Sequence, residues 1–160
     1  MRWDQLVEFL CDMSWCTLKS NFEEARMATF YDRTGKPIAY TEDNETIYLF
    51  SGEPVAYLYG DAVYSFIGRQ LGWCEDGWIR DLKGACVFFS ENSKGGGPGP
   101  MRPIKKFTPV KAAKFTKPFK GARFVKQVKP IKLLSWSVLS GEQFFPQRLI
   151  PAIDFIRLLS

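Results

Sequence analysis

The stretch IYLFSGEPVAY, residues 47–57, decides the fold. β-Branched and aromatic residues stand on both sides of a short segment that contains Gly52, which is typical of a β-hairpin. Three other stretches have the same layout: FYDRTGKPIAY at 30–40, VYSFIGRQLGW at 63–73 and WIRDLKGACVFF at 78–89. The chain therefore repeats one hairpin four times.

The four stretches align on one glycine each, with spacings of 17, 16 and 16 residues: Gly35, Gly52, Gly68 and Gly84. We expect these structural turn glycines to have positive φ. An apolar residue stands five positions before each of them: Phe30, Ile47, Val63 and Ile79. A single hairpin cannot bury such a column, but four hairpins around a shared axis can. The sequence predicts an all-β fold of four consecutive β-hairpins around a pseudo-fourfold axis, spanning residues 28–93.

Other columns of the repeat leave alternatives open. Aromatic residues fill two of them: Tyr40, Tyr57, Trp73 and Phe89, and then Tyr31, Tyr48 and Tyr64 with Arg80 in the fourth copy. These rings are either core or an exposed stacking surface. Ala39, Ala56 and Gly72 suit a close approach of backbones, whereas the fourth copy has Phe88. Phe88 indicates either a distorted unit or a plug at one end.

Several longer motifs carry a family resemblance. They are YDRTGKPIAY (31–40), IYLFSGEPVAYL (47–58), LGWCEDGWIRD (71–81), GACVFF (84–89) and LSWSVLSGEQFF (134–145). Over residues 28–146 the chain resembles the bacterial 4-fold beta flower proteins. The resemblance implies four hairpins around a pseudo-fourfold axis and a closing segment at 134–146. The family has no established activity, so the resemblance assigns no catalytic residue.

The two ends of the chain extend past this resemblance. Residues 1–27 form an N-terminal extension for which two interpretations stay open. Trp3, Leu6, Val7 and Leu10 have the spacing of an amphipathic helix, whereas the purine-rich codons expected for EEAR suggest that Met27 is the natural start. Residues 147–160 are predicted to be helical, as a cap on the fold or a partner-binding helix. No apolar run is long enough to span a bilayer and the N-terminus lacks a signal-peptide pattern, so we expect a cytoplasmic protein.

The composition disfavours most enzyme chemistry. The chain has no histidine, which removes the commonest general base and transition-metal ligand. Its four cysteines form no C-x-x-C pair and are expected to be reduced thiols. An enzyme would need an acid pair at Asp76 and Asp81 or a reactive Cys74, and turn residues are the preferred interpretation of the two acids. We expect no enzyme activity, no cofactor and no metal.

Residues 94–133 form a segment of different composition, which we call the ribbon. Residues 94–132 hold ten Lys, two Arg and no acid, a charge of +12, so the other 121 residues carry −7 of the total +5. Prolines at this density exclude a helix and favour polyproline II or an extended edge segment. Basic, apolar and proline residues alternate in loose rotation. The ribbon is interpreted as a solvated tail, as a strap whose apolar residues dock on the hairpins, or as a site for an anionic partner.

The leading functional hypothesis is a non-enzymatic binding or scaffold module. The alternative is non-specific nucleic-acid binding through the ribbon, because interleaved cations and rings suit phosphates and bases. Its candidate residues are Lys105, Lys106, Lys111, Lys114, Lys117, Lys120, Arg123, Lys126, Lys129 and Lys132. No membrane partner is expected, and a homo-oligomer is left open.

Overall fold

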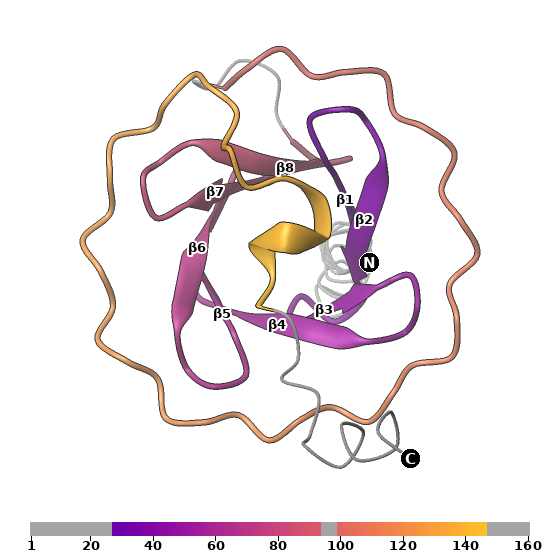
Figure 1. Cartoon of the computed structure of the whole chain (residues 1–160), viewed down its shortest axis with the longest axis vertical. Helices are drawn as coiled ribbons and strands as arrows, with labels where there is room; N and C mark the ends of the chain where they lie inside the picture. Colours follow the sequence, from indigo (N-terminus) through magenta and orange to yellow (C-terminus); the bar gives the residue numbers. More distant parts are fainter. Residues whose placement is uncertain (1–26, 94–98, 147–160) are drawn as a thin grey trace, which may run out of the picture.

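The computed structural model describes residues 27–93 and 99–146, and eight antiparallel strands of this part close into one barrel (Figure 1). The strands are β1 (Ala28–Tyr31), β2 (Pro37–Thr41), β3 (Thr46–Leu49), β4 (Pro54–Tyr59), β5 (Ala62–Tyr64), β6 (Gln70–Glu75), β7 (Trp78–Asp81) and β8 (Cys86–Ser90). Each strand pairs with the next, and β1 also pairs with β8. The predicted all-β fold of four hairpins is confirmed. The predicted terminal helices lie outside the described residues.

The four hairpins share one turn geometry. Their glycines have φ of 75°, 88°, 89° and 91°, and each glycine N–H donates to the carbonyl three residues earlier at 2.9–3.1 Å. Each hairpin also has a β-bulge at the same place, directly after its first inward apolar residue. The alignment of the sequence on these glycines therefore identifies the register of all four units.

The inside of the barrel is filled by cross-strand pairs of one large and one small residue. Phe30 lies opposite Ala39, Ile47 opposite Ala56 and Val63 opposite Gly72. The small partner is needed because the backbones approach closely: a Cβ on Gly72 would lie 2.0 Å from the Arg80 carbonyl oxygen. These side chains form the central apolar cluster.

Phe88 is the exception in the small column, and the closing segment explains it. The fourth hairpin has the same bulge as the others, so the unit is not distorted. Instead, the Phe88 ring stacks on Phe145 with centroids 5.6 Å apart and meets Phe144 edge-on. A short 3₁₀ helix, η1 (Gly141–Phe144), lies over the centre of the barrel in Figure 1, and the side chains of Phe144 and Phe145 pack into the central apolar cluster. Phe88 thus provides the contact surface for the closing segment.

The aromatic columns lie on the outer face of the barrel, because successive strand residues point to opposite sides. Where one hairpin joins the next, a residue of one column pairs across the strands with a residue of the other, and we call these four places seams. The seams are Tyr40–Tyr48, Tyr57–Tyr64, Trp73–Arg80 and Phe89–Tyr31. In the three all-aromatic seams the rings stack with centroids 5.4–5.8 Å apart. All eight side chains are at most 5% exposed. The prediction that the rings are buried is confirmed, and an exposed stacking surface is wrong.

Candidate binding surface

The ribbon is what buries the seams, and it does so in a regular way. It runs around the whole barrel and passes the tip of every hairpin (Figure 1). The carbonyls that reach the four turn glycines belong to residues nine positions apart: Ile104, Ala113, Ala122 and Ile131. One nine-residue repeat thus serves each hairpin. The repeats are RPIKKFTPV (102–110), KAAKFTKPF (111–119), KGARFVKQV (120–128) and KPIKLLSWS (129–137), the last of which continues into the closing segment.

Backbone hydrogen bonds clamp the ribbon at each tip. The carbonyl oxygen of each turn glycine accepts a hydrogen bond from a backbone N–H of the ribbon, at 2.8–3.0 Å. The donors and acceptors are Lys106 to Gly35, Phe115 to Gly52, Phe124 to Gly68 and Leu133 to Gly84. A Cβ on these glycines would lie 1.9–2.1 Å from the ribbon carbonyl oxygen. The glycines are therefore required for two reasons, the positive φ of the turn and the close approach of the ribbon, and only the first can be predicted from local sequence.

The cations of the ribbon occupy one of its faces. Apart from Thr108, every third residue from Arg102 to Lys132 is a lysine or arginine. Three residues per turn is the period of polyproline II, in which every third side chain points the same way. Lys106 is the one candidate cation outside this spacing.

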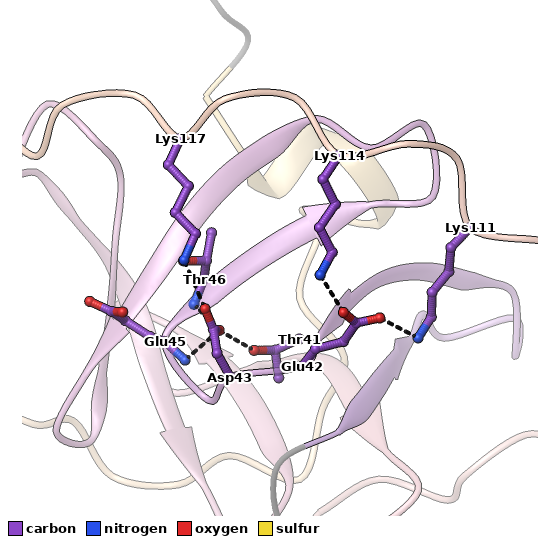
Figure 2. Close-up of polar contacts among 8 residues, drawn as sticks. All are labelled: Thr41, Glu42, Asp43, Glu45, Thr46, Lys111, Lys114 and Lys117. Carbon is purple, nitrogen blue, oxygen red and sulfur yellow. Dashed lines mark hydrogen bonds and ion pairs between the residues drawn. The ribbon is translucent and has the colours of Figure 1, made fainter.

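Carboxylates in the links between hairpins accept these cations (Figure 2). Glu42 accepts from Lys111 at 2.8 Å and from Lys114, and Asp43 accepts from Lys117 at 2.9 Å. The backbone N–H groups of Glu45 and Thr46 also donate to Asp43 Oδ1, at 3.0 and 2.7 Å, and these bonds fix the orientation of the carboxylate.

The links before β5 and β7 repeat this arrangement. Asp61 pairs with Lys126 and, at 2.9 Å, with Lys129. Lys129 also reaches Glu75 at 2.6 Å, and Lys132 lies 3.1 Å from the same carboxylate. The link acids and the ribbon cations therefore form a chain of ion pairs along the barrel. The pairs are partly solvent-exposed, so each one contributes about 0–1 kcal/mol.

These pairs shift the titration of the acids. Hydrogen bonds from Lys126 and Lys129 lower the pKa of Asp61 to about 2. Burial opposes ionisation of Asp43, yet the N–H of Thr46 and the Lys117 ammonium hold its pKa well below its usual range. The pKa values of Glu42 and Glu75 are lowered by their lysines in the same way. The contact between the ribbon and the barrel therefore depends on ionised carboxylates.

The same cations also cover the seams. Lys111 Nζ lies 4.6 Å from the Tyr40 ring centroid, and Lys120 Nζ lies 4.9 Å from the Tyr57 centroid. The third seam is covered by Lys126, whose Nζ is 5.0 Å from the Trp73 ring. Cation–π contacts at such partly exposed sites are worth about 0.5–1 kcal/mol each. Most of the cations predicted to bind an external anion are thus engaged with the barrel of their own chain.

The apolar residues of the ribbon face solvent. Eight of them, which we call the apolar belt, have side chains 85–94% exposed: Met101, Ile104, Phe107, Val110, Phe119, Val125, Val128 and Ile131. The prediction that the apolar side chains dock on the hairpins is wrong, since Phe107, Phe115, Phe119 and Phe124 are 89%, 58%, 94% and 63% exposed. The ribbon is held by its cations because the connections between hairpins present acids and the seams present aromatic ring faces.

Comparison with known proteins agrees with this geometry. A family model described as 4-fold beta flower protein matches residues 28–145, which include all eight strands, the ribbon and the closing segment. The chain belongs to this family. No curated protein and no solved structure is measurably similar to it. Within the described residues of this flower protein, no helix is long and apolar enough to cross a membrane.

The structure places Cys74, Asp76 and Asp81, the residues that an enzyme would need, in strands and a turn of the barrel. Asp76 lies in the turn before β7 and Asp81 is the last residue of β7, so the strand separates the two acids. Asp81 accepts from two turn N–H groups and from Ser137 Oγ at 2.6 Å. Burial raises the pKa of Cys74 to about 11, which disfavours the thiolate. Residues 27–93 and 99–146 contain no group of three acidic or cysteine side chains placed to hold a metal ion.

Proposed function

We propose that this flower protein is a non-enzymatic binding module and that the apolar belt is its binding surface. The observation that carries the proposal is the 85–94% exposure of the eight belt side chains. Large exposed apolar side chains gathered on one face of a segment mark interaction sites. Here the ribbon has the opposite orientation to an ordinary surface segment, because its charges face the barrel and its apolar residues face solvent.

The docked ribbon is suited to recognition because it is ordered before a partner arrives. Its backbone is clamped at the four hairpin tips, and its cations are paired between them. A partner that meets a preorganised segment loses less conformational entropy than one that must order a loose tail. The belt therefore presents phenylalanine and aliphatic side chains at fixed spacing, which suits apolar pockets on a partner protein.

Nucleic-acid binding is the second candidate. It is favoured by Phe107 and Phe119, which are 89% and 94% exposed and can stack on bases, beside lysines such as Lys117 whose side chain is 45% exposed. It ranks lower because phosphates would have to displace carboxylates that already neutralise the ribbon. Phosphate contacts would also make such binding fall steeply with salt.

An affinity capture with three versions of the full chain tests the proposal. The belt variant is Phe107→Ser/Phe119→Ser, and the matched control is Ile67→Ser, which removes a 67% exposed apolar side chain from a hairpin tip. Proteins retained by the wild type and by the control, but lost from the belt variant, support the belt as the binding surface. Retention that ends with nuclease treatment supports nucleic acid instead. Equal retention by all three versions refutes the belt.

A further inference from the structure

The strip of outer barrel surface that the ribbon covers, which we call the groove, has the properties of a peptide-binding site. At each hairpin it repeats a backbone acceptor on the turn glycine, and the links before β3, β5 and β7 add carboxylates that take cations of the ribbon. Aromatic seams lie between these points and receive the same cations on their ring faces. Aromatic-lined grooves with flanking acids suit extended, proline-rich segments that carry cations.

The ribbon is a repetitive ligand for this groove. All four repeats place cations at the first and fourth positions: Arg102 and Lys105, Lys111 and Lys114, Lys120 and Arg123, and Lys129 and Lys132. Since each repeat meets one hairpin at the same backbone positions, a stretch of two repeats already contains everything that two neighbouring hairpins recognise. Recognition is thus local to each quarter of the barrel and needs no continuous circle of chain.

The seams also hold polar groups that the docked ribbon does not use. Tyr40 Oη, Tyr57 Oη and Trp73 Nε1 occupy the same column in three successive units and are buried without a hydrogen-bond partner among the described residues. An indole N–H only donates, so the Trp73 site calls for an acceptor. A segment with an acceptor at this point would complement the seam better than the ribbon does.

We propose that the groove is a recognition site for extended peptides of other chains that carry a cation at every third residue, and that the ribbon is its built-in, displaceable occupant. Partly exposed ion pairs and one to three backbone hydrogen bonds hold each quarter of the ribbon, so a segment of the same chemistry competes for it one quarter at a time. This site lies on the inner side of the ribbon and is independent of the apolar belt on its outer side.

The test uses a labelled peptide of residues 111–128 and a control peptide of equal composition with each cation exchanged with a neighbouring residue. Both are titrated by fluorescence anisotropy against the full chain and against Lys114→Glu/Lys117→Glu. These substitutions place like charges against Glu42 and Asp43 and lift one quarter of the ribbon. Faster chymotryptic cleavage after Phe115 in the variant verifies the opening.

The proposal expects the in-register peptide to bind the opened variant at least tenfold more tightly than the wild type, and at least tenfold more tightly than the control peptide. Equal binding of the two peptides overturns it, because general charge attraction then explains the contact. Absence of binding to the opened variant overturns it as well. If the variant does not fold, the titration uses wild-type chain nicked after Phe115, and a nicked ribbon that excess peptide cannot displace also refutes the proposal.

Discussion

Replacing Gly52 by alanine tests the clamp between hairpin and ribbon most directly. Gly52 has φ +88°, a conformation that costs an L-residue about 1–2 kcal/mol. The new Cβ would lie 1.9 Å from the Ala113 carbonyl oxygen, so the ribbon backbone must move away. Two flanking hydrogen bonds of 2.9 Å, from Ala112 to Phe50 and from Phe115 to Gly52, are lost with it. At about 1 kcal/mol each, they bring the expected loss of unfolding free energy to about 3–4 kcal/mol.

Gly60→Ala is the matched control. Gly60 also has positive φ, +61°, but no atom lies within 4 Å of its Cβ position. It is expected to lose only the conformational part, about 1 kcal/mol. Urea unfolding measures both variants, and limited trypsin digestion after Lys111 and Lys114 reports whether the ribbon has lifted. Equal destabilisation by the two substitutions, or unchanged cleavage in Gly52→Ala, would refute the clamp.

Three more outcomes are expected. Phe145→Ala, which removes a ring from the central cluster, should lower the free energy of urea unfolding by about 3–5 kcal/mol, whereas Phe119→Ala on the belt should change it by no more than about 0.5 kcal/mol. The pKa of Asp61 is lowered to about 2 from an unfolded value of about 3.9, so its contribution to stability is present above about pH 4 and is lost as the pH falls toward 2. The NMR signals of the ribbon amides should shift between these pH values, and Asp61→Asn should remove part of that shift. Cys74 is partly buried and its pKa is raised to about 11, so it should react more slowly with a thiol reagent at neutral pH than in urea. Mass spectrometry of the labelled peptides measures the two rates, and equal rates would contradict the raised pKa.

The hairpins could be predicted because their signals are local. β-Propensity on both sides of a glycine turn, repeated at a period of 16 or 17 residues, identifies each unit from a few neighbouring residues. The role of Phe88 could not be predicted in this way. Its partners Phe144 and Phe145 are more than 50 residues away, and only the return of the closing segment brings the rings together.

Only part of the candidate binding surface can be predicted from the sequence. The nine-residue repeat is present in the sequence, and aligning the ribbon at that period would have matched one repeat to each hairpin. Composition alone does not identify the nine-residue period, because prolines occupy different positions in different repeats. Composition without the period predicts an external binding site for the cations and a docking role for the phenylalanines, and the structure reverses both.

The sequence by itself determined the four hairpins, their positive-φ glycines and the three-residue spacing of cations and apolar side chains in the ribbon. These features depend on backbone sterics and local periodicity, which act within a few residues. Only the tertiary structure decided which face of the ribbon points inward. An amphipathic extended segment has two faces, and the choice depends on the surface that it meets. The closed barrel places Glu42, Asp43, Asp61 and Glu75 beside the outer aromatic seams, so the cations turn inward and the apolar belt is left to solvent.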